Sequence, residues 1–168
     1  MNCDNLKLVK VTAKNFDELI ELEVNEDQKN YVADNCYSLA EAYATIADGE
    51  AAAMPFGIYD GETPVGFLMI GYNVRGDWDD ETPDFSKNSY LIWRFMIDKK
   101  YQGKGYGRAA MTLALDYIKT FPCGKADCCW LSYEPENEVA KKLYASFGFV
   151  EQPGFYKEGD EMPAVLKL

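Results

Sequence analysis

The sequence predicts a single α/β domain over residues 1–168, built on a mixed β-sheet. Three observations lead to this class. The 168 residues are enough for one hydrophobic core and too few for two typical domains. Apolar patterns of strand period and helix period alternate along the chain. A strand, a helix and a second strand follow one another within residues 90–134, and this order predicts a parallel, right-handed crossover.

Five elements are predicted before residue 75, each from the spacing of its apolar residues. In chain order they are a strand at 6–11, helices at 16–22 and 39–47, and strands at 54–59 and 65–74. Ser38 and Glu41 match a capping box that opens the second helix, and Gly49 follows its end. Asp60 and Gly61 supply turn residues between the last two strands, which therefore form a β-hairpin.

The second half of the chain begins with a loop and continues with alternating strands and helices. Residues 75–89 are polar, acidic and interrupted by Pro83, which predicts the loop. The elements that follow are a strand at 90–97, a helix from Gly105 or Gly107 to about Phe121, a strand at 126–133, a helix after Asn137, and short strands near Phe149 and at 164–168. Asn137 is a favourable N-cap, and Gly148 is a favourable C-terminal stop.

The composition excludes several classes of protein and site. The sequence has no histidine, which removes Ser-His and Cys-His catalysis and every histidine-ligated metal site. Its five cysteines show no C-x-x-C spacing, so we expect small reduced hydrophobes and no metal site. The net charge of −11 argues against a nucleic-acid surface and is compatible with a cationic partner. No apolar run reaches the roughly 18 residues that span a bilayer, so we expect a soluble, cytoplasmic protein.

The stretch Y-Q-G-K-G-Y-G-R at 101–108 predicts a site for phosphate. It lies between an apolar strand and the start of a helix, where backbone N–H groups and the helix dipole attract anions. Lys104 and Arg108 add positive charge. A dinucleotide fingerprint needs glycine at position 108, and a Walker loop needs glycine at 108 and lysine at 109, but the chain has Arg108 and Ala109. We therefore expect the phosphate of another kind of ligand, and the alternative is a glycine-rich turn that binds no ligand.

Two motifs together resemble the GNAT superfamily, the acyl-CoA-dependent N-acetyltransferases. The first is Q-x-x-G-x-G, formed by Gln102, Gly105 and Gly107 directly after an apolar strand. The second is N-E-V-A-K-K-L-Y-A-S-F-G-F at 137–149, which looks like the family pattern N-x-x-A-x-x-L-Y-x-x-x-G-F. With the order of strands and helices, the resemblance covers nearly the whole chain.

The resemblance implies a fold, a cofactor and a set of binding residues. It implies helices on both faces of the mixed sheet, whose central parallel strands, here 90–97 and 126–133, splay apart to receive a pantetheine arm. The implied cofactor is acetyl-CoA. The residues implied to bind it are Phe95, Met96, Ile97, Gln102, Gly103, Lys104, Gly105, Tyr106, Gly107, Arg108 and Asn137.

The resemblance also implies a catalytic acid but leaves the base open. Tyr144 matches the tyrosine that protonates the leaving thiolate in many family members, and a phenol with a pKa near 10 suits this role. Tyr144 also lies on the apolar face of its predicted helix, and this pattern alone favours a tyrosine that packs in the core. The family motif favours the catalytic acid instead. The strand segment at 91–94 lacks the glutamate that some members use as a base. Candidates elsewhere are Glu23, Glu26 and Asp27.

Residues 32–42 and 93–107 look like parts of bacterial spermine and spermidine acetyltransferases. If this resemblance holds, the eight carboxylates within residues 21–50 would attract a polycation. Otherwise these carboxylates form an ordinary solvated helix face. Tyr31, Trp78 and Trp93 are candidates to cover a methylene chain and contact ammonium groups, with packing roles as the alternative.

The predicted function is direct transfer of an acetyl group from acetyl-CoA to a primary amine in a ternary complex. The leading acceptor is a polyamine such as spermidine or spermine. Open alternatives are another small amine, an aminoglycoside, a protein N-terminus, a non-catalytic CoA-binding sensor and, more distantly, a nucleotide-binding phosphotransferase. The expected partner is a polycationic small molecule, with no nucleic acid and no membrane. The sequence does not determine the oligomeric state, and a homodimer is one assembly it allows.

Overall fold

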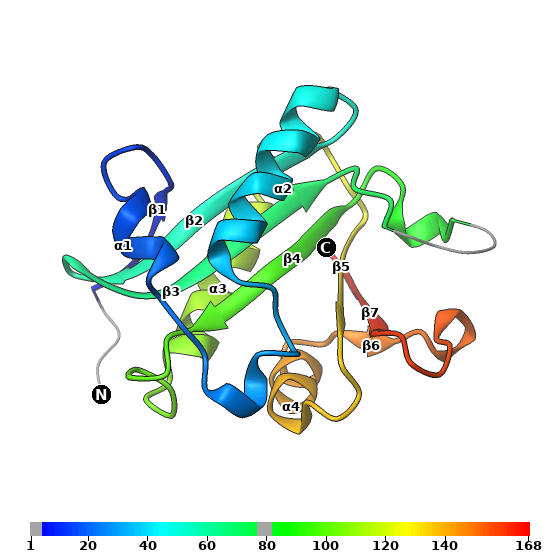
Figure 1. The fold of residues 1–168 in the computed structure, drawn as a ribbon. Coiled ribbons are helices and arrows are strands. Elements are labelled where there is room, and N and C mark those ends of the chain that lie inside the picture. The colour runs from blue at the N-terminus through cyan, green and yellow to red at the C-terminus, as the bar shows by residue number, and fades with distance from the viewer. Residues whose placement is uncertain (1–4, 77–81) are drawn as a thin grey trace.

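One mixed sheet forms the centre of the computed structural model, which describes residues 5–76 and 82–168 (Figure 1). Its order is β1-β2-β3-β4-β5-β7-β6. The strands are β1 (Leu6–Lys10), β2 (Ala52–Asp60), β3 (Thr63–Tyr72), β4 (Tyr90–Ile97), β5 (Cys128–Tyr133), β6 (Val150–Glu151) and β7 (Met162–Lys167). Neighbouring strands are antiparallel, except that β4 and β5 are parallel. The predicted mixed α/β class and its parallel pair are confirmed.

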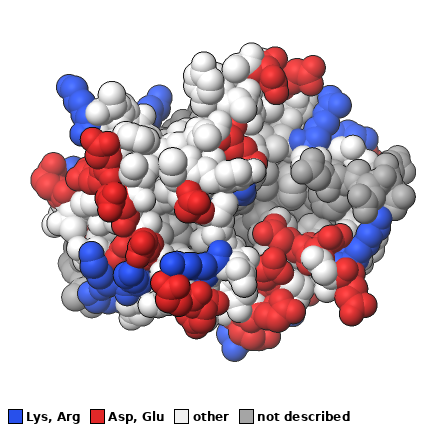
Figure 2. All heavy atoms as spheres, in the orientation of Figure 1, with Lys and Arg blue, Asp and Glu red and all other residues white. Residues whose placement is uncertain are grey.

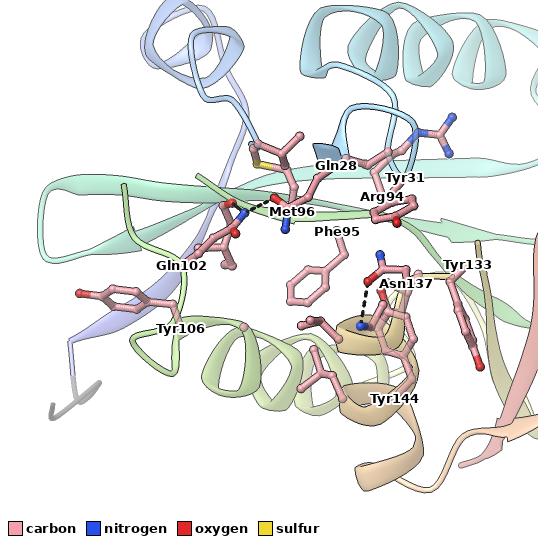
Figure 3. Close-up of a pocket in the computed structure, with 18 of the residues that line it drawn as sticks. Gln28, Tyr31, Arg94, Phe95, Met96, Gln102, Tyr106, Tyr133, Asn137 and Tyr144 are labelled. Atoms are coloured by element: carbon pink, nitrogen blue, oxygen red, sulfur yellow. Dashed lines mark hydrogen bonds between the residues drawn. The ribbon is translucent and has the colours of Figure 1, made fainter. Parts of the chain in front are cut away.

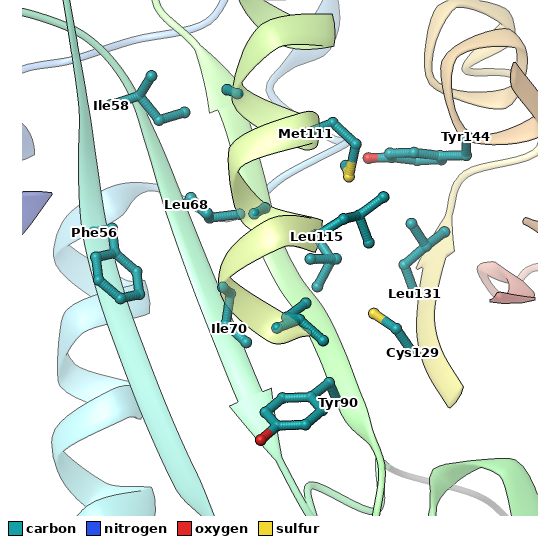
Figure 4. Close-up of a cluster of buried hydrophobic side chains, with 14 of the residues drawn as sticks. Phe56, Ile58, Leu68, Ile70, Tyr90, Met111, Leu115, Cys129, Leu131 and Tyr144 are labelled. Atoms are coloured by element: carbon teal, nitrogen blue, oxygen red, sulfur yellow. The ribbon is translucent and has the colours of Figure 1, made fainter. Parts of the chain in front are cut away.

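Helices cover both faces of this sheet, as expected. They are α1 (Phe16–Ile20), α2 (Asn35–Asp48), α3 (Tyr106–Ile118) and α4 (Glu138–Ser146), with short 3-10 helices η1 (Glu26–Gln28), η2 (Asp84–Ser86) and η3 (Pro153–Phe155). Side chains alternate along β3, so Leu68 and Ile70 pack toward α3 while Phe67 and Met69 pack toward α2. Figure 4 shows the α3 side of this core. No helix in the described residues is long and apolar enough to cross a membrane.

The parallel strands β4 and β5 separate soon after they begin. They pair only through Tyr90 with Cys129 and Leu91 with Trp130. The next residues of β4 carry a bulge, because Ile92 and Arg94 pair with consecutive residues of β3 and leave Trp93 as the extra residue. A bulge bends its strand and increases the local twist, which turns β4 away from β5. The predicted splay of the central strands is therefore present.

The start of α2 differs from the sequence prediction. The capping box at Ser38 and Glu41 is wrong, because the helix begins a turn earlier. Asp34 is the N-cap, and its carboxylate accepts a hydrogen bond from the Tyr37 N–H at 2.7 Å. Ser38 lies inside the first turn, where its hydroxyl donates to the Asp34 carbonyl at 2.8 Å. The end agrees with the prediction, since Gly49 follows the helix with φ +74°.

The two helices that border the central strands start where the motifs predicted. Gly105 precedes α3 with φ +88°, so it is the correct one of the two predicted starts. The side-chain oxygen of Asn137 accepts a hydrogen bond from the Ala140 N–H at 3.0 Å and caps α4. The predicted loop at 75–89 contains η2, and residues 77–81 within it lie outside the described residues.

Candidate active site

The gap between β4 and β5 forms a cleft of about 480 Å³ (Figure 3). Its walls come from β4, the glycine-rich loop, α3, β5 and α4, with the segment 24–32 at one side. Most of the residues proposed from sequence line it, namely Tyr31, Trp93, Phe95, Met96, Ile97, Gln102, Gly103, Gly105, Tyr106, Gly107, Arg108, Asn137 and Tyr144. Four others are described but lie outside its lining: Glu23, Glu26, Asp27 and Lys104.

Backbone groups of β4 face the cleft where β5 has diverged. The Asp98 N–H donates to the Val65 carbonyl of β3 at 2.9 Å, so the backbone groups of alternate residues point toward β3. Those of Phe95 and Ile97 consequently point toward the side on which β5 no longer pairs. This open edge of β4, defined as the backbone of Phe95 and Ile97, presents N–H and C=O groups to a ligand in the cleft.

The glycine-rich loop has the shape of an anion site. Gly103 and Gly105 have φ values of +73° and +88°, and a Cβ built on either would find no heavy atom within 4 Å. These glycines therefore serve backbone conformation and leave space in front of the loop. The N-terminus of α3 follows at once, and the N–H groups of a first helical turn point out along the helix axis, toward this space. The residues present fit a bound phosphate group.

The two predicted cations of the loop lie differently. Arg108 lines the cleft in the first turn of α3, with its guanidinium 5.5 Å from the ring centre of Phe147. The Lys104 ammonium donates to the Lys100 carbonyl at 2.8 Å and lies 5.2 Å from the ring centre of Tyr101. Arg108 is thus the cation placed to contact a ligand in the cleft.

Tyr144 is both a core residue and a cleft residue, so each sequence interpretation describes part of its setting. It points from α4 toward Met111 of α3 in Figure 4. Its ring packs against Tyr133 and Phe149 at centroid distances of 5.5 and 6.1 Å. Burial, followed by the nearby charge of Glu161, raises the pKa of the Tyr144 phenol above its ordinary value. The phenol therefore stays protonated at neutral pH, the form that can donate a proton.

The neighbouring phenol of Tyr133 is engaged elsewhere. Its hydroxyl donates to the Glu151 carboxylate at 2.5 Å, and the same carboxylate pairs with the Lys141 ammonium at 3.1 Å. Burial and this carboxylate raise the Tyr133 pKa. In Figure 3 its hydroxyl points away from Tyr144 and the cleft.

The carboxylates proposed near the N-terminus have local partners. Glu23 pairs with Lys99 at 2.6 Å, and the hydrogen bond from that ammonium lowers the pKa of Glu23. Glu26 pairs with Lys29 at 2.7 Å. Asp27 lies exposed on η1. Trp78, proposed as an acceptor-side ring, lies outside the described residues.

Glu161 is a cleft residue that the sequence analysis missed. Among the described residues that line the cleft it is the only carboxylate. It directly precedes β7, and the antiparallel pairing of β5 with β7 brings it beside Ser132, whose hydroxyl donates to it. Nothing in the polar stretch K-E-G-D-E at 157–161 distinguishes this acid from its neighbours, because the strand pairing alone selects it.

A second cavity of about 880 Å³ adjoins the cleft. The two share Trp93, Arg94, Ser132 and Glu161 as lining residues, so these four residues form the border between them. Its carboxylates are Glu41, Asp48, Glu50 and Glu161, and its arginines are Arg75 and Arg94. The acids of the segment 21–50 that meet a cavity are thus Glu41 and Asp48 of α2 and Glu50, two residues beyond the end of the helix. Carboxylates gather along the lower rim of the hollow in Figure 2.

Arg94 lies at the junction of these two cavities and is partly buried. Its guanidinium pairs with Glu41 at 2.8 Å and donates to the Trp93 carbonyl at 2.9 Å. The exposed fractions of the two paired side chains are 19% and 28%. Glu41 therefore neutralises the charge of Arg94 at the border between the two cavities.

Comparison of the sequence with known proteins identifies the family of this chain. A model of the Acetyltransferase (GNAT) family matches residues 14–149. A probable spermine N(1)-acetyltransferase of Bacillus subtilis subsp. natto (strain BEST195) is 29% identical over 148 residues, which cover 86% of this chain and 88% of that protein. A spermine/spermidine N(1)-acetyltransferase of Bacillus subtilis (strain 168) is 28% identical over 148 residues, with coverage of 86% and 88%.

Solved structures share the fold at lower sequence identity. Spermidine N-acetyltransferase from Vibrio cholerae, in complex with CoA and spermine, aligns with a TM-score of 0.68 and 21% identity over 98% of this chain and 96% of that chain. Aminoglycoside acetyltransferase AAC(6')-Ib in complex with coenzyme A aligns with a TM-score of 0.71 and 18% identity over 96% of this chain and 94% of that chain. The family match spans most of the sequence, both motifs included. This chain belongs to the GNAT acetyltransferase family and is an acyl-CoA-dependent N-acetyltransferase.

Proposed function

We propose that the protein acetylates a primary amine of a polyamine such as spermidine or spermine. The observation that carries the acceptor assignment is the carboxylate-lined cavity that adjoins the cleft. A flexible polycation would place one amine in the cleft and its other ammonium groups near Asp48 and Glu50, since Glu41 is already paired with Arg94. The two Bacillus subtilis relatives, named as a probable spermine N(1)-acetyltransferase and a spermine/spermidine N(1)-acetyltransferase, support this choice.

Different residues of the cleft would bind different parts of acetyl-CoA. The pyrophosphate would lie on the backbone amides of the glycine-rich loop and the first turn of α3, with Arg108 beside it. The pantetheine arm would follow the open edge of β4 toward Asn137. When bound, acetyl-CoA supplies the thioester carbonyl that is the electrophile. Backbone N–H groups of the open edge would stabilise negative charge on that oxygen, as in an oxyanion hole.

Two side chains are proposed to handle protons. The amine must be neutral to attack, and Glu161 is the cleft carboxylate able to accept its proton, directly or through water. Tyr144 lines the cleft, carries its phenolic proton at neutral pH and would donate it to the departing thiolate. Two adjoining cavities that meet at Glu161 support direct attack in a ternary complex, because acceptor and donor would approach the same point from different sides.

An aminoglycoside is the second candidate acceptor, and the experiment described below distinguishes it from a polyamine. An aminoglycoside is also a polyamine, and the AAC(6')-Ib structure in complex with coenzyme A and kanamycin aligns with a TM-score of 0.71. At 19% identity this similarity supports the fold and not the acceptor. Polyamines are favoured because the two Bacillus subtilis relatives, which cover most of this chain, are named as polyamine acetyltransferases, and the second cavity carries four carboxylates.

Initial rates of thiol release from acetyl-CoA test the proposal. The acceptors are spermidine, spermine, a diamine, kanamycin and a peptide with a free N-terminus. We expect the highest kcat/KM with spermidine or spermine, and intersecting lines when both substrates are varied, as a ternary complex requires. A higher kcat/KM for kanamycin or the peptide would reassign the acceptor. Tight CoA binding without thiol release in the presence of any acceptor would indicate a CoA-binding sensor.

The homodimer stays a prediction, and sedimentation velocity of the purified protein tests it.

A further inference from the structure

The segment between α1 and α2 is fastened to the residues that follow β4. The Glu23 N–H donates to the buried Asp98 carboxylate at 3.0 Å, and the Lys99 N–H donates to the Glu23 carbonyl at 2.8 Å. The Lys99 ammonium pairs with the Glu23 carboxylate at 2.6 Å. Glu23, considered from sequence as a base, thus joins two segments that are 75 residues apart in the chain.

A second set of contacts centres on the side-chain amide of Gln102. Its Nε2 donates to the Ile97 carbonyl at 3.0 Å and to Gln28 Oε1 at 2.8 Å. Its Oε1 accepts from Asn25 Nδ2 at 3.1 Å. Gln28 Oε1 also accepts from the Asn25 N–H at 3.2 Å, which completes a closed network. Gln28 and Gln102 are labelled in Figure 3.

This network connects three parts of the active site. Gln102 is the first residue of the Q-x-x-G-x-G motif, and Ile97 belongs to the open edge of β4. Asn25 is the N-cap of η1 and Gln28 is its last residue. Gln28 itself lines the cleft, as do Val24, Tyr31 and Val32 nearby in the chain. One small set of amide contacts therefore fixes the loop, the strand edge and the cleft wall relative to one another. The phosphate motif does not require this arrangement, because its glycines and helix terminus bind anions without side chains.

We propose that Asn25 and Gln28 are positioning residues for the cofactor. They hold Gln102, and through it the open edge of β4 and the glycine-rich loop, in the conformation that binds acetyl-CoA. A loop that is already ordered loses less conformational entropy on binding, so the network increases affinity in addition to any contact that Gln28 and Gln102, which line the cleft, make with the ligand. The inference rests on the proposed placement of CoA in this loop and is independent of the acceptor.

The test uses substitutions that keep side-chain volume and remove hydrogen bonds. Gln28→Met removes the oxygen that Gln102 donates to. Gln102→Met removes the centre of the network, and the double variant completes a mutant cycle. Gln152→Met is the matched control, because within residues 5–76 and 82–168 the Gln152 side chain has one hydrogen bond, to the nearby Val150 carbonyl at 2.9 Å. The readouts are the CoA dissociation constant by calorimetry and amide hydrogen exchange by mass spectrometry.

We expect Gln28→Met to raise the Kd for CoA about three- to tenfold, the range for losing one or two neutral hydrogen bonds. The double variant should bind no more weakly than Gln102→Met. Exchange should accelerate in residues 97–107 and stay unchanged in 52–72, which a general loss of stability would not produce. Gln152→Met should bind CoA like the unmodified protein.

An unchanged Kd in Gln28→Met, or independent effects of the two substitutions, would overturn the inference. Arg108→Ala separates this result from a failure of the proposed function. If Arg108→Ala weakens CoA binding while Gln28→Met does not, the loop holds CoA and only the positioning role is wrong. If CoA binding is insensitive to Arg108→Ala, the proposed placement of CoA fails, and the inference fails with it.

Discussion

Tyr144 combines packing and chemistry in one side chain. Its ring belongs to the α3 side of the core, so Tyr144→Phe keeps the contacts with Tyr133 and Phe149. Removal of the hydroxyl deletes the proton proposed for the thiolate. We expect kcat to fall about 100-fold or more, the range for a general acid, with the CoA dissociation constant unchanged. Steady-state kinetics and calorimetry check this, and an unaltered kcat would remove Tyr144 as the acid.

Glu161 acts on the other side of the proposed reaction. Glu161→Gln keeps a hydrogen-bond acceptor for Ser132 but removes the charge and the base. We expect kcat/KM for spermidine to fall about tenfold or more, because both a cation contact and proton transfer are lost. The CoA dissociation constant should be unchanged.

Glu158→Gln is the matched control for Glu161, since Glu158 is an exposed acid of the same stretch and does not line the cleft. It should retain the kcat/KM of the unmodified protein. Equal losses in both variants would show that general surface charge, and not Glu161, determines acceptor use.

The glycine-rich loop uses its glycines for two different purposes. Gly105 has φ +88° at the N-cap of α3, and Gly105→Ala should cost about 1–2 kcal/mol of stability through backbone strain. Gly107 lies inside the helix without a positive φ and lines the cleft. Gly107→Ala should keep or slightly increase stability, because alanine favours helices, and should weaken CoA binding by placing a methyl group in the cleft. Denaturant unfolding and calorimetry separate the two, and equal stability losses would contradict this division.

At the scale of elements, local patterns predicted the strands and most helix ends. Apolar runs identified β4 at 90–97 with the bounds that the structure has, and Asn137 marked the start of α4. The start of α2 was missed because Asp34 and Ser38 are both good caps, and the choice between them depends on packing. The splay of β4 and β5 follows from pairing and a bulge at Trp93, which no local pattern contains, so it came from the family resemblance.

At the scale of the whole molecule, the charge of −11 should influence acceptor binding. Carboxylates line the second cavity, and salt screens their attraction for a polycation. We expect the KM for spermidine to rise several-fold between about 0.05 and about 0.5 M salt, and the KM for a monoamine to change less. Initial rates at saturating acetyl-CoA check this, and a flat response for spermidine would assign these acids to solvation alone.

The site could be predicted from sequence where motifs specify it and not where folding brings residues together. Tyr144, Asn137 and the loop belong to continuous motifs, and they line one cleft. Glu161 reaches the cleft only through the pairing of β5 with β7, and Gln28 reaches Gln102 across 74 residues. The net negative charge indicated a cationic partner. Within the acidic segment 21–50, however, the carboxylates that line a cavity are on and beside α2 and not at 23–27. The single domain over 1–168 and the catalytic assignments stay predictions.

The central claim is that this acetyltransferase transfers acetyl from acetyl-CoA to a polyamine. Its most direct test is mass spectrometry of spermidine after incubation with acetyl-CoA, with released CoA measured in the same sample. We predict acetylated spermidine in an amount equal to the CoA released, and little of either with the Tyr144→Phe variant. CoA release without acetylated spermidine, or no release at saturating spermidine, would contradict the claim.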